Sequence, residues 1–321
     1  VYLVLANFWG VNVTSANVAE QIKHLLYVLA FVTASIVVDA YYPEKHNQLL
    51  VAMAGVATIV FWVNMLWWYQ THTFPAVRLS DVMGRMDNPI LAGCIAGVAC
   101  LVLIEILLGH GDVRFRVVAG SAFTINLGFI ILSQSRTAVA ALIPSLLVLG
   151  MSHLRRNYRL LIVAGFLAAL SVFLLQDALV GALHRNSYRI DIWVATIEKT
   201  RSNLWWGSGY FCDTVALQID GKDMQHAHNV YLATLRDGGI IGLTLLMAAV
   251  SVATWRAWRQ ARETSRYLTL ALLTYGLTAV FFDNDRLIDN PEELWIFFWY
   301  PIGRVIAHDL TQGDRLSLAQ Q

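Results

Sequence analysis

The chain has 321 residues, of which 57% are hydrophobic and only 14% are charged. Soluble domains carry about a quarter charged residues, so this composition argues against a soluble globular protein and favours one that is solvated by lipid. The formal net charge of +1 gives no reason to expect nucleic-acid binding, and we expect no nucleic-acid partner.

Long apolar blocks recur from one end of the chain to the other. A membrane-spanning helix needs roughly 17–25 mostly apolar residues, and several blocks lie at the short end of this range. One such block is often a buried core helix, but so many in one chain favour an all-α, polytopic transmembrane helical bundle. The blocks predict about nine spans, at residues 22–38, 49–68, 90–108, 117–133, 137–151, 160–175, 239–254, 267–282 and 294–308.

The first residues, VYLVLANFW, are apolar and begin at Val1 without an initiator Met or a basic region. They are typical of the end of a span that starts earlier. We therefore expect the N-terminus to be truncated.

The apolar blocks divide the chain into three regions. Residues 1–175 are expected to form the N-terminal transmembrane helices, and residues 239–321 the C-terminal transmembrane helices and a tail. Residues 176–238 are more polar and form one large loop between them. This segment is the only large piece of the chain that we expect to lie outside the membrane.

The large loop contains two predicted amphipathic helices. In residues 187–203, apolar side chains recur at helical spacing on one face (Ile190, Trp193, Val194 and Ile197). Residues 204–221 are rich in glycine and are expected to form a loop. A second helix is predicted at residues 229–237, with Asn229 as its N-cap, and it continues into the next span. Such helices can lie on a bilayer surface.

The arginine and lysine residues predict the orientation in the membrane, because loops rich in them stay in the cytoplasm. One side of the predicted bundle carries only four: Arg78, Arg85, Arg136 and Arg286. The other side carries twelve: Lys45, Arg114, Arg116, Arg155, Arg156, Arg159, Arg256, Arg259, Arg262, Arg266, Arg304 and Arg315. The C-terminus is therefore expected in the cytoplasm and the loop 176–238 in the periplasm.

Two arginines on the predicted periplasmic side are candidate anion ligands. Arg136 lies between two apolar blocks, in Ser133-Gln134-Ser135-Arg136, and Arg189 lies near the start of the first loop helix. An arginine at a span end is commonly an interfacial anchor, and one on a surface helix is commonly a solvated charge. The alternative is recognition of phosphate oxygens, which the planar guanidinium group matches in two-point fashion.

Two histidines precede the second loop helix, in Gln225-His226-Ala227-His228-Asn229. Histidine suits proton transfer near neutral pH. The alternatives are a histidine with no chemical role at a helix start, or a metal ligand. No cysteine or carboxylate stands at a familiar ligand spacing from this pair, so we expect no metal site.

Together, these residues favour transfer from a diphosphate carrier. Arginines can neutralise the charge that develops on a departing phosphate, and a histidine can accept the proton of an attacking hydroxyl. The sequence contains no P-loop, no glycine-rich dinucleotide turn and no Asp-x-Asp pair in an exposed loop. We therefore expect a reaction without a cofactor or metal.

Four segments of the chain resemble the O-antigen ligase family, whose members share a domain with O-antigen polymerases and protein O-oligosaccharyltransferases. His228-Asn229, followed after nine residues by Gly239-Ile240-Ile241-Gly242, is similar to the ligase signature and is the most specific of the four. The others are Gly84-Arg85-Met86-Asp87-Asn88-Pro89, Ser133-Gln134-Ser135-Arg136, and Arg189-Ile190-Asp191-Ile192-Trp193 with Gly207-Ser208-Gly209.

The resemblance implies a membrane glycosyltransferase of the bacterial inner membrane with its active site in the periplasm. Family members transfer O-antigen from undecaprenyl diphosphate to a sugar hydroxyl of lipid A-core, with inversion and without metal or ATP. The matched positions imply His228 as general base, Arg136 and Arg189 as ligands of the diphosphate, and His226 and Arg85 as auxiliary residues.

Other functions remain open from the sequence. An O-antigen or exopolysaccharide polymerase, or a protein O-oligosaccharyltransferase, would use the same donor with another acceptor. A transporter of an anionic lipid would need charged or broken helices in paired halves. Only Glu105 is an acidic residue well inside an apolar block, and no pairing of halves is visible.

Overall fold

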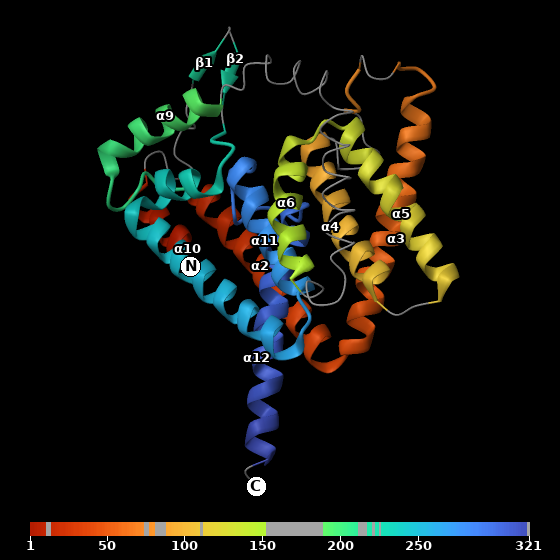
Figure 1. Ribbon diagram of the computed structural model, residues 1–321. Helices are drawn as coiled ribbons and strands as arrows, with labels where there is room; N and C mark the ends of the chain where they lie inside the picture. Colours follow the sequence, from red (N-terminus) through yellow and green to blue (C-terminus); the bar gives the residue numbers. More distant parts are fainter. Residues whose placement is uncertain are drawn as a thin grey trace. The chain divides into compact units, whose positions relative to one another are not determined.

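The computed structural model describes residues 1–10, 14–73, 77–80, 88–109, 112–151, 189–210, 217–219, 222–224 and 226–319. The regular elements of these residues are helices apart from one short hairpin, which confirms the all-α fold class (Figure 1). They fall into two compact units. The first consists of Val1–Val32, Arg185–Trp255 and Val280–Glu292, and the second of Thr33–His184, Arg256–Ala279 and Glu293–Gln321.

The described helices confirm a multi-pass membrane protein. Five of them are long and apolar enough to cross a membrane: Ser15–Tyr41, Asn47–Trp68, Pro89–Leu108, Val113–Leu132 and Val230–Thr264. Two shorter apolar helices, Arg136–Gly150 and Leu268–Phe282, coincide with two further predicted spans. The predicted span 160–175 lies outside the described residues, so the number of nine spans stays a prediction.

The predicted span 294–308 differs most from the structure. A short π-helix, Trp295–Trp299, is followed by α12, Tyr300–Ala319. The π-helix is formed by the apolar aromatic residues themselves and leads directly into a helix that also carries Arg304, His308 and Asp309. The apolar residues therefore begin the helical segment but do not fill its length.

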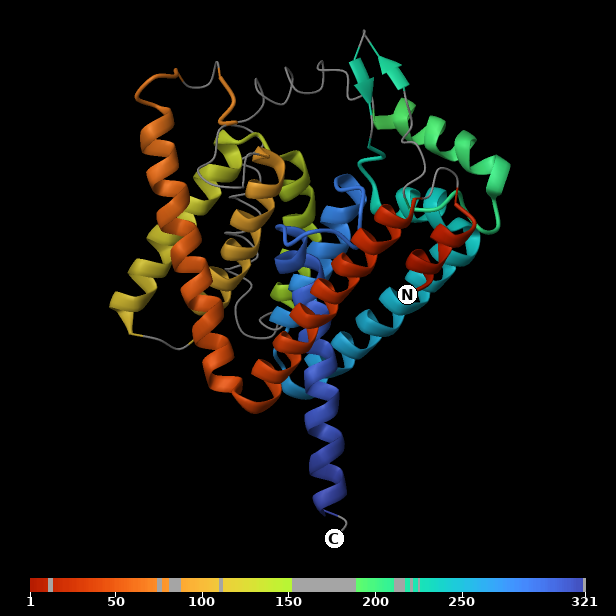
Figure 2. The same cartoon turned by 180° about the vertical axis from the view of Figure 1, so that it is seen from behind.

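The second unit is built around α4, Pro89–Leu108, which is buried along most of its length. It packs against α3 (Pro43–Trp68), α5 (Val113–Leu132) and α6 (Arg136–Gly150), and these helices lie side by side in both views (Figures 1 and 2).

Small residues on α4 permit this packing. A Cβ atom at Gly97 would lie 2.1 Å from the hydroxyl of Tyr275, and one at Gly93 would lie 2.5 Å from the Cβ of Ser135. Cys94 and Cys100 are small, fully buried side chains on the same helix. In lipid, close approach of this kind replaces the hydrophobic effect as the source of helix association.

The first unit contains the N-terminal turns and most of the predicted loop. Helix α1 (Tyr2–Leu5) is followed by η1 (Ala6–Phe8), and α9 (Arg189–Thr200) by η2 (Arg201–Asn203). The predicted helix 187–203 is thus confirmed from Arg189 onward, with a tighter last turn. Strands β1 (Leu217–Ile219) and β2 (Lys222–Met224) pair antiparallel, where the sequence predicted a loop up to residue 221.

The apolar stripe of α9 points outward. Ile190, Val194 and Ile197 are exposed, whereas Ile192, Thr196 and Thr200 are buried. The hydroxyl group of each buried threonine donates a hydrogen bond to the carbonyl one turn earlier (Thr196 to Ile192 and Thr200 to Thr196). The periodicity was therefore predicted correctly, but the exposed apolar face suits contact with lipid, as in interfacial helices.

Candidate active site

The start of α10 (Val230–Thr264) fixes the position of His228. The buried Asn229 is the N-cap of α10, as predicted. The Oδ1 of Asn229 accepts from the amides of Tyr231 at 2.9 Å and Leu232 at 3.1 Å. His228 precedes this cap with φ of +47°, in the left-handed region that non-glycine residues rarely adopt. Strained backbone of this kind is concentrated at functional sites.

One ring nitrogen of His228 contacts a carboxylate. Its Nδ1 lies 2.9 Å from Oδ1 of Asp283, the residue that follows α11 (Leu268–Phe282). Because an ionised carboxylate can only accept, this contact favours the tautomer in which Nδ1 carries the proton. The lone pair is then on Nε2. The side chain of His228 is 37% exposed, so the ring is accessible to a substrate.

Arg189 meets the same carboxylate. Its Nη2 lies 3.9 Å from Oδ2 of Asp283, and its Nη1 donates to the carbonyl of Phe282. Asp283 therefore connects two predicted site residues, Arg189 and His228, that are distant in sequence. Burial alone would raise the pKa of Asp283, but the hydrogen bond from His228 and the charge of Arg189 hold this pKa below its usual value. Asp283 is accordingly ionised at neutral pH.

A second pair lies beside the first. Oδ1 of Asp285 accepts from the amide of Ala227 at 2.9 Å, and its Oδ2 lies 3.6 Å from Nδ1 of His226. The two histidine rings are 6.2 Å apart. Burial would raise the pKa of Asp285, but His226 and the buried Arg236, whose Nη2 is 3.4 Å away, lower it. The segments 226–228 and 283–285 thus lie side by side and run antiparallel.

The carboxylates of this site were not predicted from the sequence. Asp283 and Asp285 stand directly after an apolar block, and an acidic pair at the end of a span was the only signal that pointed to them. The sequence pattern did not single out Arg236, which is fully buried and whose Nε donates to Oδ1 of Asp237 at 2.6 Å. Among the described residues, no group of three or more His, Cys, Asp or Glu is arranged to hold a metal ion.

Next to this site, the Gly207-Ser208-Gly209 segment packs against the backbone around Gly239. The amides of Ser208 and Gly209 donate to the carbonyls of Arg236 and Asp237 at 2.9 and 3.0 Å. A Cβ atom at Gly207 would lie 2.3 Å from the carbonyl oxygen of Asp237. Gly239, with φ of +66°, breaks the helical geometry inside α10 and approaches Trp205 equally closely. The glycine spacing therefore shapes the backbone that follows His228.

Replacing Gly239 by alanine should destabilise the protein by about 2 kcal/mol or more. The new Cβ would require a strained backbone and would lie 2.3 Å from the carbonyl oxygen of Trp205. Gly128→Ala in α5 is the matched control, because a Cβ there meets nothing within 4 Å. Thermal unfolding of the two purified variants measures the difference, and equal melting temperatures would contradict this account of the glycine motif.

Arg136 belongs to the second unit. It is exposed at the first position of α6, where Ser135 is the N-cap, and Oγ of Ser135 also donates to the carbonyl of Ile90 at 3.1 Å. The conformation of Gln134, with φ of +50°, turns the chain between α5 and α6. The Ser-x-Ser part of the motif thus forms the turn that presents Arg136. Arg85 lies outside the described residues.

Comparison with known proteins adds independent information. Residues 121–247 match the family model described as O-antigen ligase. The chain is also 23% identical over 308 residues to a protein of Pseudomonas aeruginosa named O-antigen ligase, and the match covers 95% of this chain and 75% of the relative. The family match includes Arg136, Arg189, His226 and His228 but ends before Asp283.

Proposed function

We propose that this chain, whose two matches support membership of an O-antigen ligase family, transfers a glycan from undecaprenyl diphosphate to a sugar hydroxyl of lipid A-core. The reaction would take place at the periplasmic side of the bacterial inner membrane. It would need no metal, since the donor is already activated by its diphosphate and arginine side chains offset the leaving charge.

His228 would act as the general base. Its Nε2 accepts the proton of the acceptor hydroxyl while the hydroxyl oxygen forms a bond to the anomeric carbon. The bond from that carbon to the diphosphate oxygen breaks on the opposite face, which inverts the configuration. Asp283, at 2.9 Å from Nδ1, orients the ring and stabilises the imidazolium that forms.

The arginines would bind the lipid diphosphate. Arg189 is held near His228 by a long ion pair of 3.9 Å with Asp283 and by a hydrogen bond to the carbonyl of Phe282. Arg136, exposed at the start of α6, would be the second ligand. His226 and Arg85 would be auxiliary.

The observation that carries this proposal is the link from His228 through Asp283 to Arg189. It brings a proton acceptor and an anion ligand together in one unit, from two separate motifs of the same family. Neither an interfacial anchor nor a solvated helix charge accounts for an arginine that shares a carboxylate with a histidine.

Transfer by the purified protein tests the proposed function. With a lipid-linked glycan as donor and EDTA present throughout, we expect product with lipid A-core as acceptor. Extension of the lipid-linked glycan instead would identify a polymerase, and glycosylation of a protein acceptor an O-oligosaccharyltransferase. A reaction that stops with EDTA and resumes with Mg²⁺ or Mn²⁺ would contradict the metal-free mechanism.

Thiol labelling tests the proposed orientation. Ser202 and Glu263 are both exposed, one after α9 and the other at the end of α10. After removal of the native Cys212, a cysteine at position 202 should react with a membrane-impermeant reagent added to the periplasm. A cysteine at position 263 should react only once the inner membrane has been opened. The reverse pattern would place the candidate site on the cytoplasmic side.

A further inference from the structure

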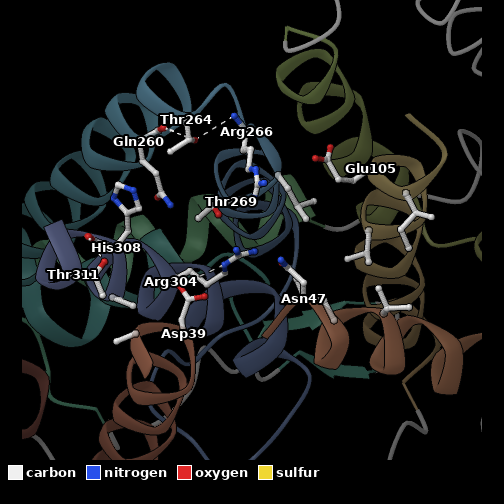
Figure 3. Close-up of a pocket in the computed structure, with 17 residues that line it drawn as sticks. Asp39, Asn47, Glu105, Gln260, Thr264, Arg266, Thr269, Arg304, His308 and Thr311 are labelled. Carbon is white, nitrogen blue, oxygen red and sulfur yellow. Dashed lines mark hydrogen bonds and ion pairs between the residues drawn. The ribbon is translucent and has the colours of Figure 1, made fainter. Parts of the chain in front are cut away.

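The second unit contains a cavity of about 650 Å³ that is separate from the candidate active site. This volume falls within the range of roughly 300–1,000 Å³ that is typical of small-molecule sites. Its walls come from the ends of helices that the sequence pattern does not bring together, including the end of α2 (Ser15–Tyr41) and the start of α3. Its lining is largely polar or charged at one end (Figure 3).

Arg304 of α12 is the central charge of this cavity. Its Nε lies 4.0 Å from Oδ2 of Asp39, and both side chains are only 13% exposed. Its Nη1 is buried and has no hydrogen-bond partner among the residues that the structure describes. The same holds for Oε1 of Gln260. Buried polar atoms left in this way are costly, so the cavity is built to receive a polar occupant.

The signs of the charges restrict this occupant. Arg266 and Arg304 supply two guanidinium groups, and Figure 3 shows both directed into the cavity. Asp39 and Glu105 supply two carboxylates on the same lining. A purely anionic ligand would meet the carboxylates, and a purely cationic one the arginines. A ligand with one phosphate and one ammonium group would satisfy both.

The remaining lining is apolar. Leu50 and Val51 of α3, Val102 and Ile106 of α4, and Leu268 of α11 border the charged end. Hydrocarbon chains attached to the ligand would find contacts here that a small soluble compound cannot use. The cavity also lies beside the connection from α2 to α3 and the connection from α10 to α11, which the basic loop residues predict to be cytoplasmic.

We propose that this cavity binds the phosphoethanolamine headgroup of a phospholipid from the cytoplasmic leaflet. The phosphate is held by the guanidinium groups of Arg304 and Arg266, and the ammonium group by the carboxylates of Glu105 and Asp39. The acyl chains leave the headgroup along the apolar side chains of α3 and α4. Basic pockets between transmembrane helices on this side of a membrane are known lipid headgroup sites.

Lipid binding to the delipidated full chain in detergent tests this proposal. Native mass spectrometry should show tighter binding of phosphatidylethanolamine than of phosphatidylglycerol, and Arg304→Gln should weaken the former about tenfold or more. Arg256→Gln removes the same charge from α10 but outside the cavity, where Arg256 pairs with Asp309, so it should bind as the wild type does. Glu105→Gln should remove the preference between the two lipids.

Other results would overturn the proposal. Equal binding of both lipids by the wild type would show that the cavity does not select a phosphoethanolamine headgroup, and equal weakening by Arg256→Gln and Arg304→Gln would show that the lipid binds elsewhere. Glycerophosphoethanolamine without acyl chains, if it bound as tightly as the lipid, would assign the cavity to a soluble compound. Arg266→Gln serves as a second variant should Arg304→Gln fail to fold, because the side chain of Arg266 is exposed.

Discussion

Replacing His228 by alanine is expected to lower transfer by about 10²–10⁴-fold, the contribution typical of a positioned general base. An acceptor hydroxyl is a poor nucleophile at neutral pH, and its proton must leave as the new bond forms. The imidazole Nε2 is suited to accept it, because Nδ1 is held by Asp283 at 2.9 Å. Turnover per molecule of correctly inserted protein is the relevant measurement.

Two further variants separate catalysis from structure at this position. His228→Gln can donate a hydrogen bond to Asp283 but cannot accept the proton, so it should fail nearly as badly as alanine. Both substitutes carry a Cβ, so the left-handed backbone at φ of +47° penalises them alike. His226→Ala is the matched control and should have a much smaller effect, because the family signature matches His228. Wild-type turnover in His228→Gln would remove the general base from the mechanism.

The arginines should show the next largest effects. Arg136→Ala and Arg189→Ala are each expected to lower turnover by about 10²–10³-fold, as is typical when a donor to the developing charge is removed. Arg136→Lys and Arg189→Lys should also impair transfer, because an ammonium group lacks the planar two-point geometry of guanidinium. The measurement is the rate of transfer at saturating lipid donor, with expression and insertion quantified for each variant.

Matched controls distinguish ligands from surface charges. Arg201 is exposed at the start of η2, directly after α9, and Arg201→Lys should retain wild-type turnover. Because Arg189 and His228 share Asp283, the double variant Arg189→Ala/His228→Ala should lose less than the sum of the two single losses. Near-full turnover of Arg136→Lys and Arg189→Lys would identify both residues as interfacial anchors and contradict their role as ligands of the diphosphate.

The helices could be predicted from the sequence because lipid requires long apolar segments. The start of α10 was also predictable, since Asn229 is a typical N-cap and its side chain accepts from the two amides expected of one. The direction of α9 was not predictable from its periodicity, because an apolar stripe may face either a protein core or lipid. Nor was the β1–β2 hairpin, which is only three residues long on each strand.

The candidate site was predictable only in part. Arg189 and His228 were identified from their motifs, but their common partner Asp283 lies 55 residues beyond His228 and has no local pattern of its own. Long-range pairing of this kind depends on how α11 and α10 meet, which the sequence pattern does not specify. The role of Arg236 was missed for a related reason, since a buried arginine and a solvated arginine look identical in a sequence.

The break at Gly239 also sets the hydrophobic length of α10. The apolar part after this residue, 240–254, is roughly 22 Å long at about 1.5 Å per residue, which is shorter than a hydrocarbon core of about 30 Å. Trp255 and Trp258, both exposed, alternate with Arg256, Arg259 and Arg262 near its end. Such a belt settles at the headgroup level, so the bilayer thins around this short segment, and bilayer thickness would govern how far the histidine end stands above the lipid.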